Sequence, residues 1–172
     1  MDVYKRGSEW KRWDLHLHTA SSYDYEYKAA DSDELLAQKL QDNNIAAVAI
    51  TDHFVIDKNR IEHLKKLAPN IVFFPGVELR TDKGDTNIHV ILIFSDKSNL
   101  DELTEDFNVF KREAKNYNND EKIYWDYNSQ ILPFAQKHNA LISIHAGRKS
   151  NGVDEKISSS LPHDQAVKSD YA

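Results

Sequence analysis

The 172-residue chain is predicted to fold as one α/β domain with mainly parallel strands. Short apolar runs alternate with amphipathic stretches in the order strand, helix, strand, helix, strand. The length suits one domain with a substantial core and is too short for two. Histidines and carboxylates follow directly after several apolar runs, which is where an α/β barrel carries its active site.

The first elements follow from alternation and helical spacing. Residues 13–18 predict a strand, and the polar and aromatic residues 22–31 predict a loop. Ser32 is a candidate cap for a helix that runs to about residue 43, with leucines at helical spacing. The unbroken apolar run 45–50 predicts a strand that is covered on both faces.

The next elements are set by proline and glycine. Residues 58–67 predict a second helix, which Pro69 ends. Residues 71–74 predict another buried strand, and Pro75-Gly76 predicts a turn just before Glu78.

The remaining elements begin after a predicted turn at residues 82–85. Residues 88–94 predict a strand, which forms either a hairpin with its predecessor or a further parallel strand. A long amphipathic helix is predicted over residues 99–117, followed by a polar break at residues 116–122. Residues 128–138 predict a further helix, and residues 141–145 predict the last strand. We therefore expect a single domain over 1–172, with a barrel core at 13–147 and a tail at 148–172.

Composition narrows the protein class. The chain has no cysteine, so disulfides and thiolate metal sites are excluded, and any metal must be held by imidazole and carboxylate groups. The sequence shows no signal peptide and no apolar run of membrane-spanning length, which predicts a cytoplasmic protein without a membrane partner. A net charge of −6 argues against a broad phosphate-binding surface, although a nucleic-acid substrate stays compatible with it.

The densest group of metal-binding residue types is the segment that contains His16 and His18. In an extended strand these two side chains point the same way, about 6–7 Å apart, and can hold one ion or two neighbouring ions. Alone, such a pair also fits two half-buried strand residues. Asp14 is either a hydrogen-bond partner of an imidazole or a polar strand edge.

Other candidate ligands follow later strands. Asp52 and His53 end an apolar run; Asp52 is either functional or the cap of a turn that begins at His53. Glu78 is either a metal ligand or a salt-bridge partner of Arg80.

Two further histidines lie beside predicted strands. His89 by itself fits a buried core histidine better than a ligand, and His145 ends the last strand. Three other histidines, His63, His138 and His163, have the surroundings of solvated residues. Because five of the eight histidines lie beside predicted strands, together with Asp52 and Glu78, a site for several metal ions is the leading hypothesis.

These motifs resemble the PHP (polymerase and histidinol phosphatase) domain family, a distorted α/β barrel of the (β/α)7 type found in metal-dependent phosphoesterases. The His-x-His, Thr-Asp-His and Gly-Val-Glu motifs of the family match residues 16–18, 51–53 and 76–78, and the similarity covers residues 13–147. The metal ligands that this resemblance implies are His16, His18, Asp24, His53, Glu78, His89 and His145. Glu78 would bridge ions.

The end of the chain departs from the family pattern. The final Asp-x-His is missing and only about five strands are counted, so the chain is expected to be a fragment of the barrel that lacks two ligands of a three-metal site. The group formed by Glu78, His89 and His145 is then expected to be the most complete. Residues 7–14 and 145–151 resemble the N-terminal PHP modules of large bacterial ATPases, which implies a downstream ATPase domain as a partner.

The resemblance implies hydrolysis of a phosphate ester, with up to three Zn²⁺, Mn²⁺ or Fe²⁺ ions as cofactors. Asp52 is the expected catalytic residue, orienting a ligand or moving a proton. Arg148 and Lys149 are candidate contacts for a substrate phosphate, or else a solvated pair in a loop. Alternatives are a module that binds metal without catalysis, a small-molecule phosphatase, and a nuclease acting on nucleic acid.

Overall fold

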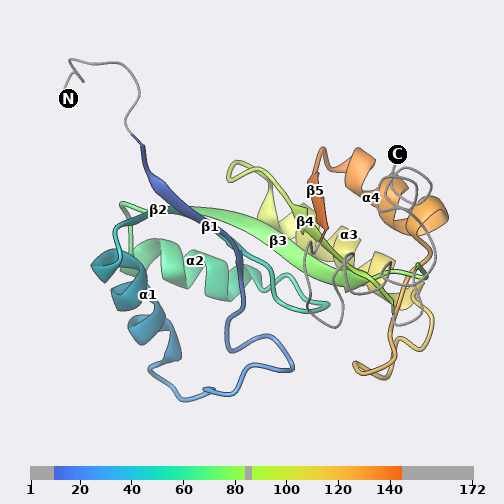
Figure 1. The fold of residues 1–172 in the computed structure, drawn as a ribbon, viewed down its shortest axis with the longest axis horizontal. Helices are drawn as coiled ribbons and strands as arrows, with labels where there is room; N and C mark the ends of the chain where they lie inside the picture. Colours follow the sequence, from blue (N-terminus) through green and yellow to red (C-terminus); the bar gives the residue numbers. More distant parts are fainter. Residues whose placement is uncertain (1–9, 84–86, 145–172) are drawn as a thin grey trace, which may run out of the picture.

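The fold is known from a computed structural model, which describes residues 10–83 and 87–144. Figure 1 shows a curved sheet with helices beside it. Its five strands lie in the order of the sequence: β1 (Arg12–Leu17), β2 (Ile45–Ile50), β3 (Val72–Arg80), β4 (His89–Ile93) and β5 (Leu141–Ile144). This confirms an α/β domain. The five strands agree with the number expected for an incomplete barrel, and the (β/α)7 type of that barrel stays a prediction.

The sheet is mixed, which corrects the expectation of mainly parallel strands. β1, β2 and β3 are parallel, whereas β3–β4 and β4–β5 are antiparallel. The chain returns from Arg80 to His89 within a few residues, too few for the crossover that a parallel pair requires. The hairpin alternative is therefore the correct one.

β3 runs straight through Pro75 and Gly76, so the predicted turn there is wrong. Pro75 is the last residue paired with β2, and Gly76 is the first paired with β4. A Cβ on Gly76 would lie 2.8 Å from the Thr51 side chain and 2.9 Å from the Leu92 carbonyl oxygen. Glycine is needed here because the neighbouring strands leave no space for a side chain.

The helices agree with the predicted ones except at their ends. They are α1 (Ser32–Asp42), α2 (Lys58–Leu67), α3 (Leu100–Arg112) and α4 (Leu132–Lys137), and α4 follows a π-helical turn, η1 (Tyr127–Ile131). Ser32 is the first helical residue rather than the cap, a position that Asp31 occupies. α3 is shorter than predicted. None of the helices in the described ranges has the length and apolar character needed to cross a membrane.

The main hydrophobic core lies between one face of the sheet and the helices. The other face carries a small apolar cluster of Ala49, Ile91 and Ile93 with Phe74 packed against it. Glu78 and Arg80 continue the row of Phe74 and Gly76, because every second residue of β3 faces the same way. The candidate site therefore lies on the face opposite the main core, toward the carboxyl end of β3.

Candidate metal centre

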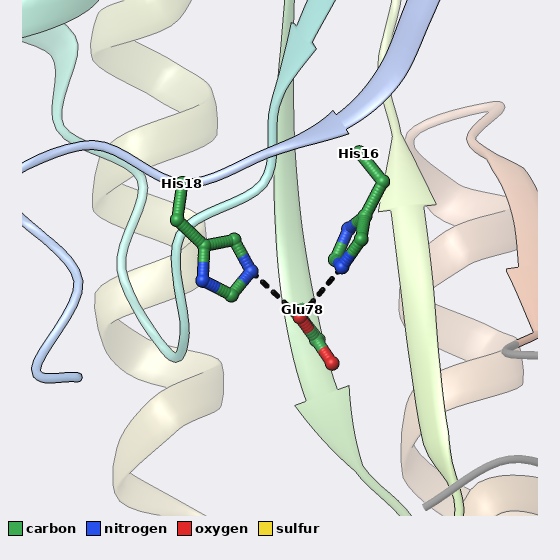
Figure 2. Close-up of side chains that lie close together, drawn as sticks. All are labelled: His16, His18 and Glu78. Carbon is green, nitrogen blue, oxygen red and sulfur yellow. Dashed lines mark hydrogen bonds and ion pairs between the residues drawn. The ribbon is translucent and has the colours of Figure 1, made fainter. Parts of the chain in front are cut away.

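Glu78 is the centre of a cluster of imidazoles. Its buried carboxylate lies within contact distance of four histidines that come from three separate segments: the end of β1, the segment after β2, and β4. Oε2 lies 3.3 Å from His16 Nε2, 2.8 Å from His18 Nε2 and 3.7 Å from His53 Nε2, and Oε1 lies 2.5 Å from His89 Nδ1. Figure 2 shows two of these imidazoles converging on the carboxylate.

His16 and His18 reach the cluster from the end of β1. Their ring centroids are 5.0 Å apart, and both rings turn toward Glu78, as alternation along a strand predicts. His16 Nδ1 lies 2.9 Å from Thr51 Oγ1, so the end of β2 fixes the orientation of this ring. Such a partner on the far nitrogen is typical of metal-binding histidines.

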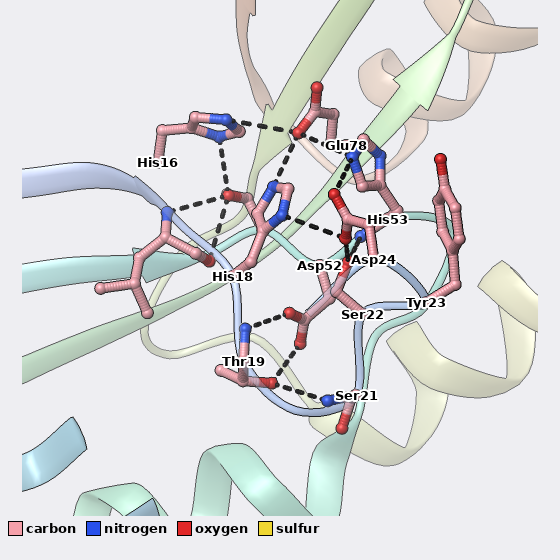
Figure 3. A network of polar contacts seen from close by, with 12 residues as sticks. His16, His18, Thr19, Ser21, Ser22, Tyr23, Asp24, Asp52, His53 and Glu78 are labelled. Atoms are coloured by element: carbon pink, nitrogen blue, oxygen red, sulfur yellow. Dashed lines mark hydrogen bonds and ion pairs between the residues drawn. The ribbon is translucent and has the colours of Figure 1, made fainter. Parts of the chain in front are cut away.

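Asp24 comes from the loop that follows β1. Its carboxylate lies 3.5 Å from His18 Nδ1 and 3.3 Å from His53 Nε2. The Ser22 hydroxyl donates a 2.6 Å hydrogen bond to Asp24 and accepts one from the His53 backbone N–H at 3.1 Å. Figure 3 shows how this serine ties the loop to the segment after β2.

His53 is held by an unusual backbone conformation. The next residue, Phe54, has φ 58°, a left-handed value that is rare for a bulky residue and marks stored strain. The Phe54 N–H donates to the Glu78 carbonyl oxygen at 3.1 Å, and the Glu78 N–H donates to the Asp52 carbonyl oxygen at 3.2 Å. These two bonds bring His53 alongside Glu78.

His89 is buried in β4, yet it faces the cluster and not the main core. It is paired across the strands with Arg80, whose Nε lies 3.2 Å from His89 Nε2. The core alternative weighed for His89 is therefore not what the structure shows. Its role as a metal ligand stays a prediction.

Asp52 is fully buried and its carboxylate binds the loop after β1. Oδ1 accepts the Thr19 backbone N–H at 2.5 Å, and Oδ2 accepts the Thr19 hydroxyl at 2.6 Å. It does not cap a turn at His53, because both of its carboxylate oxygens accept from Thr19 and the Phe54 N–H donates to the Glu78 carbonyl oxygen. Asp52 thus holds Thr19, the residue next to His18, and its expected catalytic role stays a prediction.

Burial and charge shift the pKa values of the cluster in opposite directions. Burial raises the pKa of Glu78, but hydrogen bonds from His18 and His89 outweigh it, so the net pKa lies well below the usual range. Burial also lowers the pKa of His18, and the Glu78 interaction more than offsets this and raises it. The pKa of His53 is lowered to about 4, chiefly by burial. Glu78 is therefore ionised and His53 neutral near pH 7.

The cluster offers three overlapping groups of ligand atoms. In each group the atoms lie within 4.8 Å of one another: His16, His18 and Glu78; His18, Asp24 and His53; His53, Glu78 and His89. Imidazole and carboxylate together suit Zn²⁺, Mn²⁺ or Fe²⁺. Buried His53 Nδ1 has no hydrogen-bond partner among the described residues, and such a nitrogen is costly unless something binds it. The residues therefore fit a metal ion.

Six of the seven predicted ligands are thus brought together. His145, Arg148 and Lys149 lie outside the described residues, as does the expected group of Glu78, His89 and His145. Sequence reasoning missed Thr19, Ser22 and Tyr23, which position the ligand loop, and it considered Arg80 only as a partner of Glu78. Thr19 could have been noticed because it directly follows His18 in the sequence. No feature of the sequence indicates that Arg80 contacts His89 and Tyr23.

The PHP domain family matches residues 14–157, most of the chain and all of the clustered ligands. The chain belongs to the PHP domain family. The search of curated proteins returned no significant match to this PHP chain.

Two solved structures are similar to this PHP chain at a low level. One is an amidohydrolase from Chromobacterium violaceum with bound sulfate and no metal, 19% identical with a TM-score of 0.39. The other is a proposed metal-dependent phosphoesterase from Bifidobacterium adolescentis, 20% identical with a TM-score of 0.43. Each match covers 59% of this chain, which spans only 36% and 34% of the two proteins.

Proposed function

We propose that this PHP chain provides the metal centre of a metal-dependent phosphoesterase. Membership of the PHP family supports a hydrolase of this kind. The observation that carries the proposal is the contact of one buried carboxylate, Glu78, with four imidazoles. One or two hydrogen-bond partners would satisfy a buried carboxylate, whereas four histidines around one acid are what a centre for several cations needs.

The proposed ligands are His16, His18, Asp24, His53, Glu78 and His89, with His145 as a further member. Glu78 belongs to two of the three ligand groups, which supports a bridging role for its two oxygens. Zn²⁺, Mn²⁺ and Fe²⁺ are the candidate ions because the nitrogen donors disfavour Mg²⁺. Up to three ions are proposed for a complete site.

The chain's own residues would bind and orient the reactants. A divalent ion at these ligands would polarise a phosphoryl oxygen and lower the pKa of a coordinated water. Thr51 orients His16, and Asp52, through Thr19, holds the loop that carries Asp24. With both oxygens engaged by Thr19, Asp52 is better suited to positioning than to carrying a proton.

The finer parts of the proposal concern substrate and partners. Arg148 and Lys149 are proposed to contact the phosphate of the substrate, which could be a small metabolite or a nucleic acid. The chain is proposed to be part of a longer protein in which an ATPase domain follows. Cytoplasmic location is proposed from the composition alone.

The test combines binding and turnover. Mn²⁺ binding is measured by calorimetry on the metal-free protein, and hydrolysis is assayed with p-nitrophenyl phosphate and with single-stranded DNA. Glu78→Gln and His16→Ala should weaken Mn²⁺ binding by at least about tenfold and reduce turnover in parallel, because each removes a ligand. Preference for one of the two substrates separates a phosphatase from a nuclease.

Two matched controls lie outside the cluster: Glu105→Gln on an exposed face of α3 and His63→Ala on α2. Both should bind Mn²⁺ like the wild type. Metal binding without turnover on either substrate would favour a non-catalytic metal-binding module. Unchanged Mn²⁺ affinity in Glu78→Gln would contradict the site itself.

A further inference from the structure

Arg80 places a positive charge against the candidate metal centre. It is the last residue of β3 and the cross-strand partner of His89. Its Nε–H donates to His89 Nε2 over 3.2 Å. The guanidinium lies beside the ring of Phe54, with Cζ 5.0 Å from the ring centroid. Arg80 therefore contacts His89, which forms a candidate ligand group with His53 and Glu78.

The other contacts of Arg80 are with neutral groups. Nη1 donates to the Asp120 carbonyl oxygen at 2.5 Å, and Nη2 donates to the Tyr23 hydroxyl at 2.6 Å. Among the residues that the structure describes, no carboxylate forms an ion pair with Arg80, so the pairing with Glu78 considered from the sequence is not observed. A half-buried guanidinium that no described carboxylate pairs with keeps its charge for an anionic ligand.

The hydrogen bond from Arg80 restricts what His89 can do. If Nε2 accepts the Arg80 proton, the lone pair of that nitrogen is used. Nδ1 then carries the ring hydrogen and donates it to Glu78 Oε1, 2.5 Å away. A metal ion needs a lone pair on one of these nitrogens. The Arg80 hydrogen bond and metal ligation by His89 therefore exclude each other.

We propose that Arg80 and a divalent cation compete for His89, and that the Nε–H of Arg80, released from His89 by the cation, donates to the phosphate group of the substrate. The inference rests on the proposed function and adds a regulation of the same site. Filling the group of His53, Glu78 and His89 would release the Nε–H of Arg80. Metal loading would then create the phosphate-binding group.

The geometry suits this second role. The contacts of the two Nη atoms with Asp120 and Tyr23 do not involve Nε, so the guanidinium can stay anchored while Nε–H changes partner. A guanidinium has five N–H donors, and the observed contacts use three, which leaves two more for phosphate oxygens. A phosphate near an ion on His89 would lie next to Arg80.

The experiment measures two affinities in the same proteins. Mn²⁺ is titrated into metal-free wild type, Arg80→Gln and the control Arg112→Gln, an exposed arginine at the end of α3. Inorganic phosphate is then titrated into the Mn²⁺-loaded proteins. Arg80→Gln should bind the weakest Mn²⁺ ion about tenfold more tightly and phosphate about tenfold more weakly, because a charged hydrogen bond is lost in each case. Arg112→Gln should match the wild type.

The outcomes separate this inference from the proposed function. Wild type that binds no Mn²⁺ contradicts the metal centre itself. Wild type that binds Mn²⁺, with Arg80→Gln equal to Arg112→Gln in both titrations, overturns only the role of Arg80. Should Arg80→Gln fail to fold, nitrogen NMR of the wild type decides. The ring signals of His89, identified by their loss in His89→Gln, must shift on addition of Zn²⁺, and unchanged signals overturn the competition.

Discussion

Glu78 holds its negative charge in a buried position because four imidazoles surround it. The histidines respond differently: interaction with Glu78 raises the pKa of His18, whereas burial keeps the pKa of His53 low. At the scale of single residues, the cluster is therefore a set of coupled groups whose protonation sets both stability and access for a cation.

The first prediction concerns the pH dependence of stability. The pKa of His53 falls from 6.5 to about 4 on folding. Between these values the unfolded chain binds a proton that the folded protein does not, so the free energy of unfolding falls as the pH is lowered through this window. His18, with a raised pKa, acts in the opposite direction.

His53→Gln removes the first of these effects. With EDTA present, the free energy of unfolding should fall less in His53→Gln than in the wild type when the pH is lowered from about 7 to about 4.5. The difference should be on the order of 2 kcal/mol. Urea denaturation across this range measures it. A wild type and variant with the same pH dependence would show that His53 is protonated equally in both states.

The second prediction concerns the hydroxyl that holds Asp52. Thr19→Val keeps the shape of the side chain but removes the 2.6 Å hydrogen bond to the buried carboxylate. The free energy of unfolding should fall by about 1–3 kcal/mol, because a buried acceptor loses a donor. Thr104→Val is the control, since its buried hydroxyl has no partner among the described residues. Equal losses in both variants would contradict the role of Thr19.

At the scale of elements, the decisive feature is the change of partner along β3. Its first half is paired with β2 in parallel and its second half with β4 in antiparallel orientation, and the change occurs between Pro75 and Gly76. This arrangement places Glu78 next to the end of β2 and opposite β4 at once. Three of the segments that carry ligands meet for this reason.

The third prediction tests the close packing at Gly76. Gly76→Ala should lower the free energy of unfolding by about 1–3 kcal/mol, because the new methyl group meets the backbone of neighbouring strands. Denaturation in urea measures the loss. Adding Thr51→Ser removes the 2.8 Å side-chain contact but not the 2.9 Å contact with the Leu92 carbonyl oxygen, so rescue should be partial. Full recovery of the free energy of unfolding would show that the backbone at Leu92 moves to make room for the new methyl group.

At the scale of the whole molecule, the candidate ligands tie together the ends of β1, β2 and β3, the start of β4 and the loop after β1. In the metal-free protein, several imidazoles and two acids are held close together by tertiary structure alone. An ion that binds only the folded arrangement must stabilise the entire domain, because the unfolded chain does not assemble the site.

The fourth prediction follows from this linkage. Free Mn²⁺ at about 100 times its dissociation constant should add roughly 2.7 kcal/mol to the free energy of unfolding. Thermal scans with Mn²⁺ and with EDTA measure the corresponding rise in Tm. Glu78→Gln should lose most of the rise, whereas Glu105→Gln should keep it. A Tm that does not respond to Mn²⁺, Zn²⁺ or Fe²⁺ would contradict a metal centre that is built by folding.

The local features of this protein were predictable from the sequence. The α2 range of residues 58–67 and the β2 range of residues 45–50 match the structure because apolar spacing, Pro69 and flanking polar residues act within a few positions. The turn at Pro75-Gly76 was predicted wrongly because the same two residues fit a strand that changes its partner. Local signals could not separate the two cases.

The sequence alone determined which residue types follow the strands, and so the chemistry available to the site: nitrogen and oxygen donors without sulfur. Only the tertiary structure decided that β3, β4 and β5 are antiparallel, that Asp52 binds Thr19, and that Arg80 lies against His89. The reason is physical: strand direction and side-chain partners depend on segments that are distant in the chain, and their contacts form only when the sheet assembles.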